Sequence, residues 1–143
     1  MPLVDAVEQS MLNHLMTDPA YTPPATMYIA LSTTTPNDAG GNVTEPSGGS
    51  YARVSTVAAD WDAATGTAPA TKANGTAKTF PTASATWSSG ANMTHFVLYD
   101  ALTVGNPIAW GALGTPKPVL NGDTASFPIG SLVLKLGKVG DSF

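Results

Sequence analysis

The sequence has no cysteine and very little charge. Without cysteine among its 143 residues, the chain can form neither a disulfide nor a cysteine-based zinc site. Charged residues make up 11% of the chain, which is about half the usual share in soluble proteins. We therefore expect a surface built mainly from neutral polar groups.

Basic residues and long apolar runs are also scarce. Six lysines and arginines are scattered singly and the net charge is −4, so no basic stripe could neutralise a run of phosphates. No stretch reaches the roughly 20 apolar residues that span a bilayer, and the first residues lack the pattern of a signal peptide. We expect neither nucleic acid nor a membrane as partner, and we expect the N-terminus to belong to the folded protein.

A helical pattern opens the chain. Apolar residues recur at four-residue spacing and form one stripe of a short helix, and the Thr-Asp-Pro sequence at 17–19 should end it. We assign residues 1–18 to this helix and residues 19–143 to a single β domain. The stripe consists of Leu3, Val7, Met11 and Leu15.

After the helix the apolar period changes from 3.6 to 2, the period of a strand. Residues 33–50 and 63–75 lack such a pattern and read as exposed connections. Short strands without crossover helices favour a mainly β fold, an antiparallel two-sheet β-sandwich, jelly-roll-like, with one short N-terminal α-helix. Strands are predicted at residues 26–32, 51–58, 76–81, 85–87, 94–99, 108–113, 117–120 and 132–136.

The residue types that carry catalysis are present but not grouped. Only two histidines occur, His14 and His95, and no Gly-x-Ser-x-Gly elbow accompanies them. Asp123 follows the turn dipeptide Asn-Gly, where an aspartate commonly binds the backbone of the turn. We expect no enzymatic activity and no cofactor.

Two further groups could bind ligands. Asp60 and Asp62 flank Trp61 and could face a cation, but the segment lacks the oxygen-ligand spacing of a calcium loop, so we predict a solvated loop and no metal. Trp61, Trp87 and Trp110 could form a platform for sugars, although scattered aromatic residues in strands are more often anchors of a core or an interface. A carbohydrate-binding module stays a lower-ranked alternative.

Several segments resemble a family of small virion proteins of tailed bacteriophages, which are described as capsid decoration (cement), minor structural or tail-fibre proteins. The resemblance covers residues 25–136, and its most specific pieces are SGGSYARV, THFVLYDA and GDTASFPIGSL. It implies a non-enzymatic β-sandwich in the virion.

Within this family we favour a capsid decoration protein, because the chain lacks the coiled-coil or repeat segments of a fibre shaft. The resemblance then implies homotrimers on the phage head, bound to the lattice of the major capsid protein; a tail-tip or tail-fibre component is the alternative. Arg53 could pair with a capsid carboxylate or be an ordinary surface charge on a strand. The residues expected to contact the partner are the helix stripe Leu3, Val7, Met11 and Leu15, the loop residues Asn42 and Glu45, and Arg53.

Overall fold

The computed structural model of the chain describes residues 1–16, 21–67 and 69–136. Within these residues one α-helix, α1 (Asp5–Leu15), precedes a series of antiparallel strands and two short 3₁₀ helices, η1 (Ala58–Asp60) and η2 (Trp87–Gly90). The strands are β1 (Thr26–Ser32), β2 (Val54–Val57), β3 (Ala70–Ala73), β4 (Lys78–Thr79), β5 (Met93–Tyr99), β6 (Pro107–Lys117), β7 (Ser126–Phe127) and β8 (Val133–Leu136).

The larger layer is a four-stranded sheet in the order β2-β1-β5-β6, with every neighbouring pair antiparallel. Ile29 of β1 lies opposite Leu98 of β5, and both side chains are buried in the main core. Because side chains alternate along a strand, Ala30 and Val97 face the other side of the sheet and belong to a second, smaller cluster. The predicted strands at 26–32 and 94–99 are thus confirmed.

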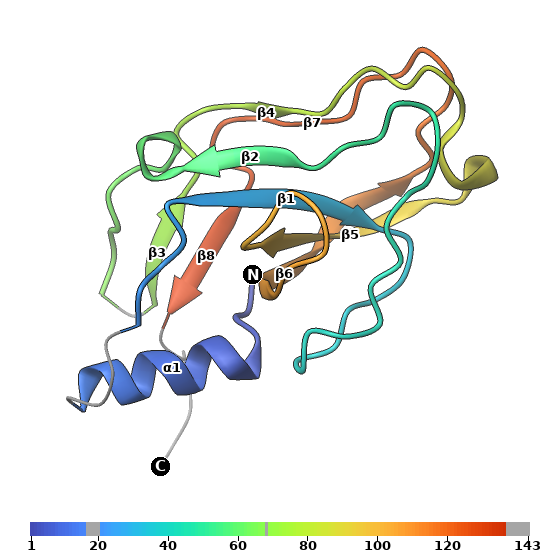
Figure 1. The fold of residues 1–143 in the computed structure, drawn as a ribbon. Helices are drawn as coiled ribbons and strands as arrows, with labels where there is room; N and C mark the ends of the chain where they lie inside the picture. The colour runs from blue at the N-terminus through green and yellow to red at the C-terminus, as the bar shows by residue number, and fades with distance from the viewer. Residues whose placement is uncertain (17–20, 68, 137–143) are drawn as a thin grey trace.

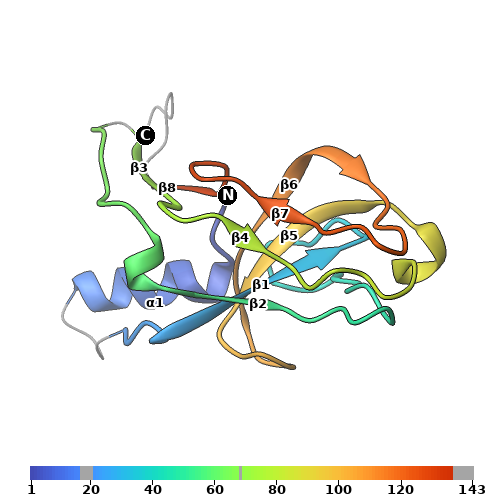
Figure 2. The same ribbon diagram turned by 90° about the horizontal axis from the view of Figure 1, so that it is seen from above.

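The second layer consists of two short ladders, β4 with β7 and β3 with β8. Figure 1 shows β4 and β7 running above the four-stranded sheet, and the view from above in Figure 2 shows them crossing over its strands. The fully buried Trp87 and Leu132 and the nearly buried Phe80 fill the space between the layers. The prediction of a mainly β, antiparallel two-layer fold with one helix is confirmed.

The opposite face of the four-stranded sheet is covered in part by residues 33–50. Figure 1 shows this segment descending below β1 and β5, on the side away from β4 and β7. Val43 packs there against the cluster that contains Ala30 and Val97, and the backbone N–H of Thr33 donates to the carbonyl of Thr44 across the base of the segment. The predicted exposed excursion is therefore a folded-back loop that packs against the sheet.

Three predicted boundaries were wrong. Strand β3 lies inside the segment 63–75, which was expected to be a connection, because its partner β8 supplies a ladder that its own sequence does not suggest. The predicted strands at 108–113 and 117–120, which were open to a hairpin or to one strand bent at a proline edge, form a single strand, β6, that ends at Lys117. The extended piece expected at 85–87 leads into η2, where Ser88 and Ser89 both have positive φ.

Candidate functional site

Arg53 lies at the centre of a network that joins three separate segments. Its guanidinium forms an ion pair with Glu45 at 2.5 Å and donates to the carbonyl oxygens of Ala101 and Val104 at 2.7 and 2.8 Å. It also stacks on the ring of Tyr99, 3.7 Å from the ring centroid, as cation–π pairs do. Only 6% of the Arg53 side chain is exposed, so its charge is used within the chain.

A tyrosine completes this network on the core side. The hydroxyl of Tyr51 donates to Glu45 at 3.0 Å and accepts from the backbone N–H of Leu31. Burial, followed by the negative charge of Glu45, raises the pKa of Tyr51 far above its ordinary value. Tyr51 therefore stays neutral and donates to Oε2 of Glu45, which also accepts from Nε of Arg53. No short sequence pattern indicates that Glu45, eight residues upstream, is the partner of Arg53.

Asn42 shapes the same loop. Its side-chain amide donates to the carbonyl of Thr35 at 2.7 Å, and its own carbonyl accepts from the hydroxyl of Thr34. Its φ of 60° is in the left-handed region, which asparagine tolerates better than most residues. Asn42 is exposed, but its polar groups hold the turn of the loop.

The predicted helix stripe is divided between core and surface. Leu3 precedes α1 and is buried, and Val7 and Met11 pack partly buried against the core. Leu15, at the other end of α1, is 73% exposed, and Leu12 and Met16 beside it are also exposed. Figure 1 shows α1 below the sheet with this end projecting away from the strands. The predicted helix stop at 17–19 lies outside the described residues, within which no helix has the length and apolar character required to cross a membrane.

Asp60, one of the two aspartates that flank Trp61, has a structural role. Asp60 forms an ion pair with Lys78 at 2.5 Å and accepts from the backbone N–H of Val57 and the hydroxyl of Thr76. These contacts, that with Lys78 foremost, lower the pKa of Asp60 to about 2. In the described part of the chain, no three metal-ligating side chains come together. The Asp60 carboxylate links the segment after β2 to β4.

The turn aspartate behaves as the sequence predicts. Asp123 Oδ2 accepts from the backbone N–H of Leu120 at 2.9 Å, and the Asp123 N–H donates back to the Leu120 carbonyl. Gly122 in this turn has a φ of 88°, which glycine adopts at little cost. One oxygen of Asp123 is thus committed to the turn.

The histidines lie in unrelated surroundings. His14 is exposed on α1. The Nδ1 atom of His95 lies 2.8 Å from the hydroxyl of Thr94, and its ring packs against Trp110 with centroids 5.9 Å apart. Burial lowers the pKa of His95. A neutral imidazole packed on an indole fits the predicted role of a satisfied strand residue.

The tryptophans do not form one platform. Trp87 has no exposed surface and its indole N–H donates to the Gly49 carbonyl at 2.8 Å, so no ligand can stack on it. Trp61 donates from its indole to Thr56 at 2.8 Å. It lines an apolar cavity of about 360 Å³ together with Met27, Leu98 and Leu134.

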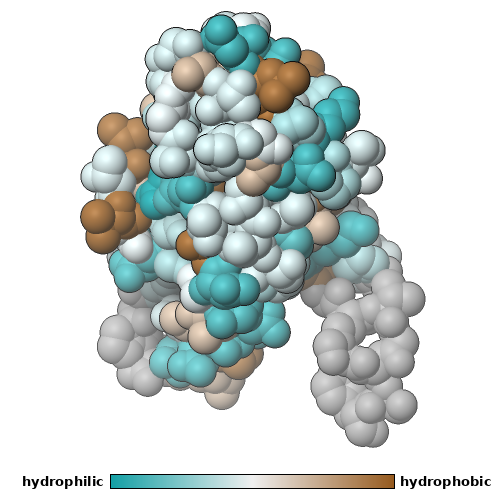
Figure 3. Space-filling model, turned by 90° about the vertical axis from the view of Figure 1, so that its right-hand side faces the viewer, coloured by the Kyte–Doolittle hydropathy of each residue, from teal (hydrophilic) through white to brown (hydrophobic). Residues whose placement is uncertain are grey.

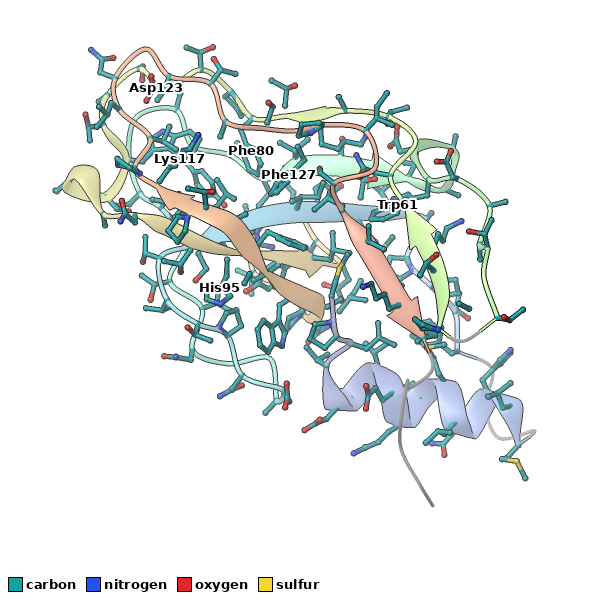
Figure 4. The ribbon with its side chains drawn as sticks, turned by 180° about the vertical axis from the view of Figure 1, so that it is seen from behind. Trp61, Phe80, His95, Lys117, Asp123 and Phe127 are labelled. Carbon is teal, nitrogen blue, oxygen red and sulfur yellow. The ribbon has the colours of Figure 1, made fainter. Side chains whose placement is uncertain are left out.

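A larger cavity of about 550 Å³ lies near the end of β6. Buried Leu31 and Met93 contribute to its lining, with half-buried Phe127 beside them. Exposed polar side chains complete it, namely Thr115, Lys117, Asp123, Thr124 and Ser126. Figure 4 shows Lys117 and Asp123 at the same end of the molecule, far from α1. The sequence analysis did not identify this site, because its residues meet only through strand pairing and a turn.

Fold and site together define a small β domain in which Arg53 pairs with Glu45 and Lys78 pairs with Asp60. Its surface carries cavities and exposed apolar side chains. The family model of the podophage GP4 fiber I protein gp80 matches residues 2–135, and the chain belongs to this family. It is therefore a phage structural protein and a component of the virion. No curated protein matches the chain significantly.

Proposed function

We propose that the protein is a non-enzymatic docking subunit of the virion's fibre apparatus. The observation that supports this most directly is the match of residues 2–135 to a family described as a fibre protein. The paired state of Arg53, Glu45, Asp60 and Lys78 agrees with a rigid scaffold. A rigid domain binds with little loss of conformational entropy.

The mechanism that we propose is binding without chemistry. Each copy binds the assembled particle, and the binding stabilises that assembly by mass action. We propose that the partners are copies of the same chain in a homotrimer and a second virion protein. The exposed end of α1, with Leu12, Leu15 and Met16 on its surface, is the contact to test first.

Decoration of the head is the second candidate. One observation favours it: the described residues form a compact two-layer domain around one main core, without the extended repeat of a fibre shaft. In that case the partner is the lattice of the major capsid protein.

Immunogold labelling of intact virions, together with a count of copies per particle, separates the two candidates. A fibre component should label the tail in about a dozen copies or fewer, whereas a shell protein should label the head in hundreds of copies, as its symmetry requires. Absence of the protein from purified particles would refute both.

The contact is tested by substitution on the surface of α1. Leu15→Glu should leave the stability within about 0.5 kcal/mol of the wild type, as expected for an exposed site, and should reduce incorporation into virions. The matched control is Leu102→Glu, at another exposed leucine that lies outside α1. Equal incorporation of the two variants would remove α1 from the interface.

A further inference from the structure

We propose that the cavity near the end of β6 binds a saccharide. This inference deepens the proposed function and rests on it only for the source of the sugar, since a protein carried on a fibre meets the glycans of a cell surface.

The cavity exists because β6 leaves the register of β5. Met93 pairs with Lys117 and His95 with Ala112, so two residue steps on β5 correspond to five on β6. The surplus residues of β6 cannot pair with β5, and such bulges turn a strand locally out of its ladder. Leu113, Gly114 and Thr115 from this stretch line the cavity. Bulges are common beside functional sites.

The lining has an apolar part and a polar part. Leu31, Met93 and Phe127 provide the apolar atoms, and the hydroxyls of Thr115 and Ser126 lie among the polar ones. Among the described residues no hydrogen bond or ion pair is formed by the Lys117 ammonium group, nor by the Oδ1 atom of Asp123. One donor and one acceptor are thus available. A volume of about 550 Å³ is in the usual range for ligand sites.

This combination suits a neutral polyhydroxyl ligand better than an ionic one. One ammonium and one carboxylate balance each other, so neither an anion nor a cation is favoured by charge. Sugar hydroxyls both donate and accept hydrogen bonds and can use both groups, while the C–H face of a pyranose can lie on the apolar part. Figure 3, which turns this end of the molecule to the viewer, shows a mostly neutral to hydrophilic surface.

A peptide strand fits the site less well. An added strand would have to pair with the edge of β6, but Pro116 lies in this stretch and Pro118 follows it. Proline has no N–H to donate to a ladder and is typical of edges that resist strand addition. Binding through side chains in the cavity is therefore favoured over strand addition.

The wall opposite β6 is fixed before any ligand binds. The N–H of Ala83 donates to the Asp123 carbonyl at 2.9 Å, and the N–H of Gly122 donates to the Ala83 carbonyl at 2.7 Å. The hydroxyls of Thr82 and Thr124 are 2.7 Å apart. Such prior order lowers the entropic cost of binding.

Methionine methyl signals give a direct test, because each cavity contains its own methionine. Met93 lines the proposed sugar site and Met27 lines the apolar cavity. The full chain is titrated with the methyl glycosides of glucose, galactose, mannose, rhamnose and N-acetylglucosamine while methyl NMR spectra are recorded. At least one glycoside should shift the Met93 signal saturably and leave the Met27 signal in place.

Two substitutions change the polar part of the lining: Thr115→Val removes a hydroxyl at nearly the same size, and Lys117→Gln replaces the ammonium group by a shorter, neutral amide. The double variant Thr115→Val, Lys117→Gln should weaken binding about tenfold, which corresponds to about 1.4 kcal/mol. The matched control is Thr103→Val, Lys135→Gln, at exposed positions outside the cavity. An unchanged Met27 signal shows that each variant is folded.

Three results would overturn the inference: no glycoside shifts Met93, the shifts occur at Met27 instead, or the double variant binds as tightly as the control. None of these results changes the outcome expected from virion labelling. A tail-labelled protein that binds no glycoside refutes the sugar site alone, whereas a head-labelled protein that binds one refutes the fibre proposal alone.

Discussion

Arg53 shows how a single residue can bind distant parts of the chain together. Its guanidinium contacts the loop 33–50 through Glu45 and the loop after β5 through the carbonyls of Ala101 and Val104. Arginine is suited to this position because its planar group carries five donors in a fixed geometry. A charge so nearly buried must be paired, because an unpaired one is costly.

Removal of this guanidinium should destabilise the protein strongly. Arg53→Met leaves Glu45 without its cation in a largely buried position, and we expect a loss of about 3 kcal/mol in the free energy of unfolding. Urea unfolding measures the change. Lys135→Met, at an exposed cation, is the control and should change stability by about 0.5 kcal/mol or less. Equal stability of the two variants would show that the Arg53 network contributes nothing.

At the same scale, the sequence predicted some roles and missed others. The turn role of Asp123 follows from the preceding Asn-Gly dipeptide, a local signal that needs no knowledge of the fold. The pairing of Arg53 with Glu45 depends on how residues 33–50 fold back, and the position of Lys117 and Asp123 in the lining of one cavity depends on the β6 bulge. Neither is encoded in a short pattern.

Among the elements, the loop 33–50 is attached to the core by its glycine-rich end. The carbonyl of Gly49 accepts from the indole of Trp87 at 2.8 Å and from the N–H of Ser84 at 3.0 Å. Gly48 and Gly49 both have positive φ, of 77° and 55°. Only Gly49 is also confined, since a Cβ there would meet the Ala85 carbonyl and lie 2.7 Å from Trp87 Cδ1.

Alanine substitutions at Gly48 and Gly49 separate the cost of the left-handed backbone from the cost of crowding by neighbouring atoms. Gly48→Ala should cost about 1–2 kcal/mol for the left-handed backbone alone, because a Cβ there would have nothing within 4 Å. Gly49→Ala should cost a further 1–3 kcal/mol or so for crowding against backbone and indole. Thermal or urea unfolding, followed by Trp fluorescence, measures both. Equal losses would mean that the loop end is not packed as described.

Strands were predictable where the sequence carries a strand pattern and not where pairing alone creates them. β1 and β8 carry apolar residues at alternate positions, β5 concentrates β-branched and aromatic residues, and all three were predicted. β3 has the sequence ATKA, which has no such alternation, and it is extended because β8 pairs with it from 60 positions away in the chain, Ala73 opposite Val133. For residues 108–117 the sequence left a hairpin and a continuous strand both open, and the strand forms because proline is tolerated at an unpaired edge.

On the scale of the whole molecule, Asp60 links the two layers through an ion pair. It follows β2 of the four-stranded sheet and bonds Lys78 of β4 in the second layer. Its carbonyl also accepts from the N–H groups of Gly75 and Thr76, which lead into β4. Because the core lies between these layers, the contacts of Asp60 affect the stability of the entire domain.

Acid should remove the stabilisation by Asp60 within a defined range of pH. The folded pKa of Asp60, about 2, is below the ordinary value of 3.8, so the unfolded chain binds a proton more readily. The stabilisation is therefore complete above about pH 4 and is lost as the pH falls towards 2. Urea unfolding of the wild type and of Asp60→Asn should show a difference in stability that is constant near neutrality and shrinks across this range. In a Lys78→Met background, Asp60→Asn should change the free energy of unfolding by less, since the contact with Lys78 is the largest cause of the lowered pKa of Asp60. A difference that stays constant down to pH 2 would mean that the Asp60 carboxylate does not hold the layers together.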